Sequence, residues 1–135
     1  LARMQNEKKI DTTLQIITCV NKDSEKAISR AKKTLAFYIS VGKIYRKFLA
    51  SNGFENETKN IFEEYEKNGL QDNHELVPDS MMNELCIAGT SDECRIQLKQ
   101  FRETGIDLPI IQFNPIDNVV DSFDLVTSTF SEESN

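Results

Sequence analysis

The feature that most constrains the fold is an alternation of short apolar runs with longer amphipathic segments. The apolar runs are Thr12–Val20, Glu84–Ala88 and Pro109–Phe113, and polar residues flank each of them. Short runs of this kind, closed by turn residues, are typical of buried strands. Strands that alternate with helices are parallel and are joined by crossover helices. We therefore expect an α/β fold that is rich in helix and has about three parallel strands.

The segments between these runs place apolar residues at the three-to-four spacing of amphipathic helices. The longest extends from Ser24 to Ser51, and Gly42 is a point at which it can divide into two helices. The other expected helices are Glu57–Asn68, a short stretch after Pro78, a segment from Thr90 to Gly105, and one over Ile116–Phe130. Residues 12–130 are thus the expected ordered core, between a polar lead-in over residues 1–11 and an acidic tail over 131–135.

Composition excludes several classes of protein. The 135 residues include 16 basic and 22 acidic ones, for a net charge of −6, which argues against a nucleic-acid backbone as the main partner. No apolar run approaches the roughly 20 residues of a membrane span. Cys19, Cys86 and Cys94 lack metal-type spacing and fit reduced thiols, which indicates a cytoplasmic protein.

The strand count is small for the length of the chain. Three strands are few for a free-standing parallel sheet, and consecutive strand–helix units of a larger protein explain them better. A complete (β/α)8 barrel takes about 250 residues, roughly twice this chain. The chain also begins at Leu1 rather than Met, and we interpret that start as a truncation point.

Two segments together resemble a known family. Residues 85–111, LCIAGTSDECRIQLKQFRETGIDLPII, resemble the final strand–helix–strand of the luciferase-like monooxygenase superfamily. Residues 31–54, AKKTLAFYISVGKIYRKFLASNGF, resemble its helical region, in the same order and at a similar separation. The likeness covers about residues 12–115 and is greatest to flavin- or deazaflavin-dependent reductases such as methylenetetrahydromethanopterin reductase.

This resemblance implies that residues 1–135 are the C-terminal part of a single (β/α)8 TIM barrel domain. Such enzymes bind FMN or the deazaflavin coenzyme F-420 at the carboxyl ends of their strands. They transfer hydride between that cofactor and a small organic substrate, and the intact protein can form a homodimer. In the family, most cofactor contacts come from strands that would precede Leu1, so the resemblance implies that this chain alone is inactive.

Gly89 and Thr90 are the candidate cofactor-binding residues. They stand where a strand meets the next helix, and free backbone amides there can receive a phosphate. The alternative is that Thr90 or Ser91 only caps the helix, with Asp92 and Glu93 complementing its dipole.

The candidate residues on the substrate side are Asn21, after the first strand, and Gln112 and Asn114, at the end of the last one. Their alternatives are an ordinary turn at Asn114-Pro115 and a helix cap at Asp23 or Ser24. No residue stands out as catalytic, and no spacing predicts a metal site.

Other polar and sulfur-bearing residues fit structural roles. His74 is isolated in a polar segment, and we interpret it as a solvated loop histidine. Met81 and Met82 are expected to fill the core. Three glutamates are expected to form a solvated helix face: Glu63, Glu64 and Glu66.

A second function remains open on the sequence. The chain could be a stand-alone, non-catalytic α/β module that binds a partner through an aromatic helical face. That face would consist of Phe37, Tyr38, Tyr45 and Phe48. Packing against the rest of the fold is the simpler expectation for most of these side chains.

Overall fold

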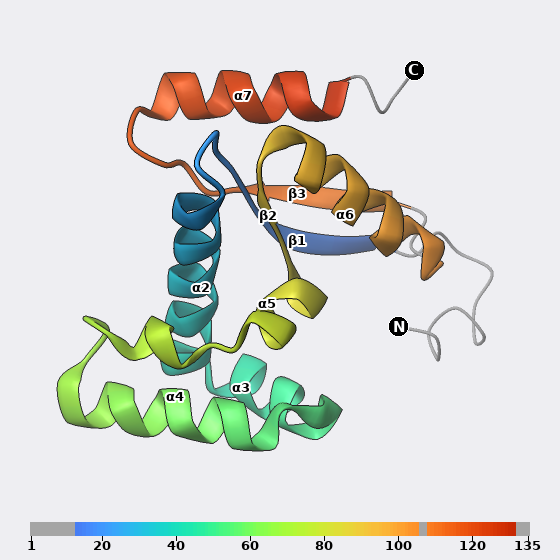
Figure 1. Ribbon diagram of the computed structural model, residues 1–135. Helices are drawn as coiled ribbons and strands as arrows, with labels where there is room; N and C mark the ends of the chain where they lie inside the picture. The colour runs from blue at the N-terminus through green and yellow to red at the C-terminus, as the bar shows by residue number, and fades with distance from the viewer. Residues whose placement is uncertain (1–12, 106–107, 132–135) are drawn as a thin grey trace.

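The computed structural model describes residues 13–105 and 108–131, so the lead-in and most of the acidic tail lie outside the described residues. Its three strands form one parallel sheet (Figure 1). They are β1 (Thr13–Val20), β2 (Cys86–Gly89) and β3 (Leu108–Phe113). The expected helix-rich α/β class with three parallel strands is therefore confirmed.

The strand order within the described sheet is β2-β1-β3. β1 lies in the middle, and β2 and β3, which follow each other in the chain, do not pair. The connection from β1 to β2 runs toward one edge of the sheet, and the connection from β2 to β3 runs back across β1 toward the other edge. Because such crossovers are right-handed, the two connections place their helices on opposite faces of the sheet.

One face of the sheet packs against α2 (Ser24–Val41) and α5 (Asp79–Leu85). Asp23 caps α2, its carboxylate accepting from the backbone of Glu25 at 3.0 Å. The buried side chains on this face include Ile17, Cys19, Ala31, Leu35, Ile39, Met81, Met82 and Cys86. The two methionines are thus core residues, as expected.

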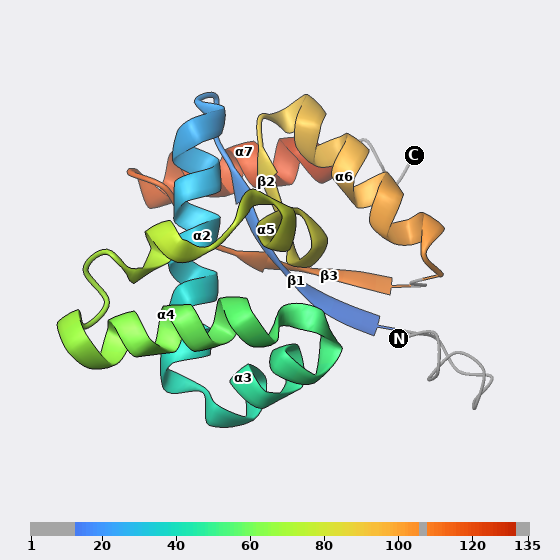
Figure 2. The same ribbon diagram turned by 60° about the horizontal axis from the view of Figure 1, so that its bottom comes forward.

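A helical extension continues from α2 beyond the sheet. Gly42 ends α2 and separates it from α3 (Lys43–Leu49), which confirms the expected division. A kink over Ala50–Phe54, where Asn52 and Gly53 leave the helical conformation, leads into α4 (Glu55–Asn68). Figure 2 shows α3 and α4 side by side at the end of the molecule away from α6 and α7. A short 3-10 helix, Asn73–Leu76, then leads back toward α5.

The other face of the sheet packs against α6 (Ser91–Glu103) and α7 (Val119–Ser131). Its buried side chains are Ile16, Val20, Ile87, Cys94, Leu98 and Val126. Alternate residues of β1 thus enter different clusters, as expected for a strand covered on both faces.

Several element boundaries differ from the expectation, among them the starts of β2 and α7. The run Glu84–Ala88 was expected to be a strand, but α5 continues to Leu85 and β2 begins at Cys86. The last helix begins at Val119 rather than Ile116, because Asp117 has a positive φ of 58° that a helix does not allow.

The expected aromatic face is divided between core and surface. Tyr38 and Tyr45 pack against the core, with ring centroids 6.0 Å apart. Phe37 and Phe48 instead leave 44% and 61% of their surface exposed. Among the described helices, none combines the length and the apolar character that crossing a bilayer requires.

Candidate functional site

The carboxyl ends of the three parallel strands meet at one edge of the sheet. Val20 at the end of β1 pairs with Gly89 at the end of β2, and Thr18 pairs with Phe113 at the end of β3. The backbone N–H of Asn21 donates to the carbonyl of Gly89 at 3.0 Å. The structure therefore brings two candidate residues together, at the edge where ligands of parallel α/β proteins bind.

Thr90 forms a reciprocal cap with Glu93 at the start of α6. The Thr90 hydroxyl accepts from the backbone of Glu93 at 3.4 Å, and the Glu93 carboxylate accepts from the Thr90 N–H at 2.8 Å. Hydrogen bonds to its carboxylate hold the pKa of Glu93 below its ordinary value. The bond from the Thr90 backbone has the largest effect, followed by those from the Ser24 and Thr90 side chains. A carboxylate of the protein thus occupies a backbone amide that a phosphate would use.

Gly89 makes room for that carboxylate. Its φ is +143°, and a Cβ built on it would lie 2.8 Å from Glu93 Oε1. The absence of a side chain at Gly89 therefore allows the Glu93 carboxylate to reach the Thr90 N–H and cap α6. A cofactor-binding role for Gly89 and Thr90 stays a prediction.

Side chains of α2 form hydrogen bonds with the half-buried Gln112 and the buried Asn114. The Gln112 amide donates to the Tyr38 hydroxyl at 2.8 Å. The buried Asn114 accepts from the Thr34 hydroxyl at 3.0 Å and donates to the Gln112 carbonyl at 2.9 Å. The structure gives both amides protein partners, and their substrate-side role stays a prediction.

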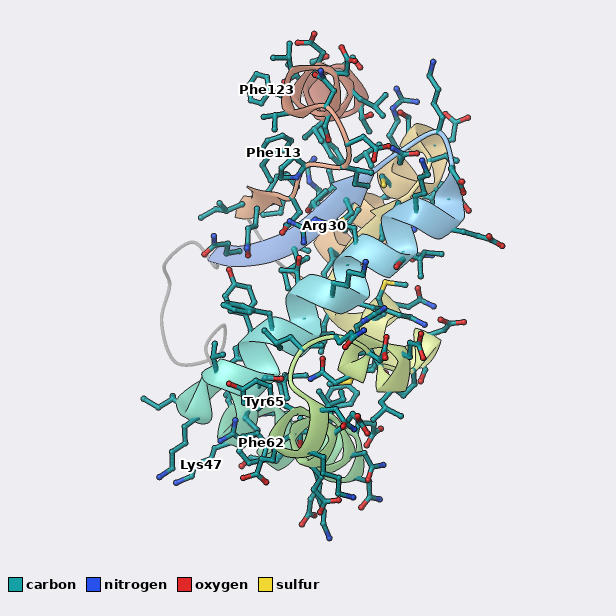
Figure 3. The ribbon with its side chains drawn as sticks, turned by 90° about the vertical axis from the view of Figure 1, so that its left-hand side faces the viewer. Arg30, Lys47, Phe62, Tyr65, Phe113 and Phe123 are labelled. Carbon is teal, nitrogen blue, oxygen red and sulfur yellow. The ribbon has the colours of Figure 1, made fainter. Side chains whose placement is uncertain are left out.

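Arg30 extends this hydrogen-bonded group, and sequence reasoning missed it. It donates to the carbonyl of Pro115 at 3.1 Å and to the Thr34 hydroxyl at 2.5 Å. Figure 3 shows Arg30 beside the sheet, between the ends of the molecule. Arg30, Thr34 and Tyr38 recur every four residues along α2, and this row of hydrogen-bonding side chains on one side of the helix was the available signal.

An open cleft of about 620 Å³, here called the strand-end cleft, lies beyond β1 and β3. Its apolar lining is Val20, Ile116 and Leu125, and its polar lining is Asn21, Lys22, Asp117, Asn118, Asp121, Ser122, Asp124 and Ser128. Lys26 pairs with Asp117 at 3.3 Å. Of the candidate residues, Asn21 alone lines this cleft, and its side-chain oxygen accepts from the backbone of Asp23 at 2.9 Å.

The cysteines do not contribute a nucleophile. All three are free and buried. Burial raises the pKa of Cys19 and of Cys94 to about 12, and it also raises the pKa of Cys86. Because the thiolate is the reactive form, these thiols are inert at neutral pH.

His74 differs from the solvated loop residue that we expected. It lies in the 3-10 helix and is half-buried, and its Nδ1 has no hydrogen-bond partner among the described residues. Within residues 13–105 and 108–131, no three side chains of His, Cys, Asp or Glu gather as a metal site would require.

The fold and the polar strand ends define a class: an α/β protein of parallel strands whose carboxyl ends carry polar residues at one edge of the sheet. A model of the luciferase-like monooxygenase family matches residues 2–108, and the chain belongs to this family. The resemblance seen in the sequence is therefore confirmed.

Among solved structures, the chain is similar to a coenzyme F-420-dependent tetrahydromethanopterin reductase from Methanopyrus kandleri. The two are 20% identical, with a TM-score of 0.72 over 99% of this chain and 39% of the reductase. The chain thus shares the fold of one part of a TIM-barrel protein and spans well under half of its length. No curated protein sequence matches the chain.

Proposed function

We propose that the chain is part of an oxidoreductase that transfers hydride between a flavin or deazaflavin and a small organic substrate. The observation that carries this proposal is the match to the luciferase-like monooxygenase family over residues 2–108. The dependence of the similar reductase on coenzyme F-420 supports a cofactor of this kind. We further propose that residues 1–135 are the C-terminal part of one barrel domain, with residues 12–130 as its ordered core and residues 131–135 as a tail.

The described residues do not fit the phosphate end of FMN or of coenzyme F-420. At the start of α6, Glu93 already accepts the Thr90 N–H. The strand-end cleft carries three aspartates, Asp117, Asp121 and Asp124, against a single lysine, Lys22. Carboxylates repel phosphate, so these residues form no phosphate site.

The strand-end cleft fits a polar substrate group better than a phosphate. The ammonium of Lys22 and the side-chain amide of Asn21 are donors on its wall. The carboxylates accept hydrogen bonds from hydroxyl or amino groups. In this proposal, Asn21 orients the substrate, while Gln112 and Asn114 hold the loop after β3 in position.

Spectroscopic titration of the complete protein with FMN and with coenzyme F-420 tests the function. We expect saturable binding of one of the two, and binding of neither would overturn the proposal. The 135-residue chain is titrated alongside with FMN and with riboflavin, which lacks the phosphate. We expect tight binding of neither, since most of the cofactor site lies outside the chain in this proposal.

A non-catalytic partner-binding module is the second candidate, and the exposure of Phe37 and Phe48 favours it. A complete protein that binds no flavin or deazaflavin, yet loses a protein partner on substitution of Phe48, would support this candidate. The three free, buried cysteines fit a reducing compartment in either case, and we propose the cytoplasm.

A further inference from the structure

Two groups of large apolar side chains are exposed on the described surface. The α2–α3 patch consists of Phe37, Val41, Ile44 and Phe48, of which Ile44 is 85% exposed and Phe48 61%. The α7 patch consists of Val119, Val120 and Phe123, which are 58%, 66% and 56% exposed. Single exposed apolar residues are ordinary, but such groups mark sites of interaction.

The two patches lie at opposite ends of the molecule. α7 lies at the top of Figure 1, and α3 lies at the bottom. Figure 3 shows Phe123, whose ring meets that of Phe113 edge to face, far from Lys47 of α3. One patch therefore cannot cover the other within the same copy of the chain.

The two segments of the chain that carry the patches are opposite in charge. Residues 26–54 contain seven Lys and Arg and no Asp or Glu, whereas residues 103–135 contain seven Asp and Glu and no Lys, Arg or His. On α2, Lys33 precedes Phe37 by one helical turn, and on α3, Lys47 follows Ile44 by one turn. On α7, Asp124 follows Val120 by one turn.

These charges are available for a partner. Lys43 and Lys47 are exposed and form no ion pair with described residues, although the neighbouring α4 carries five glutamates. Asp121 and Asp124 likewise form no ion pair within the described chain. Arg46 lies over the Phe62 ring, 3.7 Å from its centroid, and so points toward α4.

We infer that the α2–α3 patch of one copy of this chain docks onto the α7 patch of a second copy. The contact buries apolar side chains of both copies and places lysines opposite aspartates. Because the two patches are unlike and lie at opposite ends, each copy offers one of each kind. This inference concerns association alone and is independent of the proposed redox function.

Light scattering after size exclusion, over a series of protein concentrations, tests the contact. We expect self-association that weakens as salt rises from about 0.05 M to about 0.5 M. Phe48→Ser and Phe123→Ser each remove one patch and should each weaken association about tenfold. An equimolar mixture of the two variants should recover a 1:1 complex, because each variant keeps the patch that the other has lost.

The control is Ile96→Ser on α6, a residue that is 60% exposed and belongs to neither patch; it should leave association unchanged. Lys43→Glu/Lys47→Glu should bind Asp121→Lys/Asp124→Lys more tightly than it binds the unaltered chain. A monomer at every concentration would overturn the inference and leave another segment or partner as the occupant. So would a mixture that recovers no complex, or association that neither serine substitution weakens.

Discussion

Position 89 has no room for a side chain, because the Glu93 carboxylate lies against Gly89. Its φ of +143° strains any side chain, and a Cβ would also lie 2.8 Å from Glu93 Oε1. We expect Gly89→Ala to lower the free energy of unfolding by about 3 kcal/mol or more, from strain and from disruption of the cap on α6. Urea denaturation of the chain measures this loss.

Gly53→Ala is the matched control for that substitution. Gly53 also has a positive φ, +102°, but a Cβ there would have nothing within 4 Å. Gly53→Ala should lower the free energy of unfolding by about 1 kcal/mol, from backbone strain alone. Equal losses for the two variants would show that the approach of Glu93 to Gly89 is not a constraint.

Glu93 should make stability depend on pH. Because its pKa is lowered in the folded protein, its ionised form stabilises the fold above the ordinary glutamate pKa. That contribution is lost as the pH falls through the lowered value. Glu93→Gln keeps an acceptor for the Thr90 N–H but removes the charge, so the variant should be less stable than the parent near neutral pH.

The difference in the free energy of unfolding between the parent chain and Glu93→Gln should become smaller as the pH falls. Urea unfolding at several values from about pH 7 to about pH 3 measures both proteins in parallel. A difference that stays constant over this range would contradict a role for the charge of Glu93.

The sequence predicted the positions of some candidate residues but not the contacts of others. The meeting of Asn21 with Gly89 follows from the βα order, because parallel strands end at one edge. The engagement of Asn114 by Thr34, 80 positions earlier, depends on how α2 packs against β3, which local patterns do not encode. The strand-end cleft was missed for the same reason, since β1, the loop after β3 and α7 form it together.

At the scale of elements, α6 protects an edge of the sheet. The Gln97 side chain accepts from the Ala88 N–H and donates to the Ala88 carbonyl, both at 2.8 Å. It thus takes the place of a neighbouring strand beside β2. Gln97→Ala should cost about 1–3 kcal/mol, because both Ala88 groups lose a partner.

Hydrogen exchange at the Ala88 amide gives the specific readout for Gln97→Ala. Exchange there should accelerate more than exchange at amides in the middle of β1. Gln100→Ala, on the same helix and exposed, is the control and should leave Ala88 unchanged. Unchanged protection of Ala88 in Gln97→Ala would show that the pair does not close this edge.

Most elements follow from local pattern, whereas their boundaries and the strand order do not. The β-branched run before Asn21 and the caps at Asp23 and Thr90 locate β1, α2 and α6. Leu85 was misassigned, because a short apolar run fits a strand and a buried helix end equally well. The order β2-β1-β3 depends on contacts between distant segments, which no local pattern contains.

At the scale of the whole molecule, β1 joins two apolar clusters. Ile17 enters the cluster under α2, and Ile16 enters the one under α6 and α7. We expect the two to unfold together. Leu98→Ala, in the second cluster, should lower the free energy of unfolding by about 2–5 kcal/mol. The whole chain should still unfold in one transition, at a lower urea concentration.

The tyrosines make this cooperativity measurable. The chain has three tyrosines and no tryptophan, and all three lie on α2, α3 or α4, at Tyr38, Tyr45 and Tyr65. Tyrosine fluorescence therefore reports on the half of the molecule that lacks Leu98. It should shift together with far-ultraviolet circular dichroism in Leu98→Ala. A fluorescence transition left at its original urea concentration would mean that the halves unfold separately.

The central position of β1 also determines when the sheet can assemble during translation. β1 leaves the ribosome before either of its neighbours, which begin at Cys86 and Leu108. The helices from Ser24 to Asn68 can form early, since their hydrogen bonds are local. Until β2 emerges, however, β1 lacks both of its partners in the described sheet, so its apolar residues stay unpaired while the segment between β1 and β2 is being made.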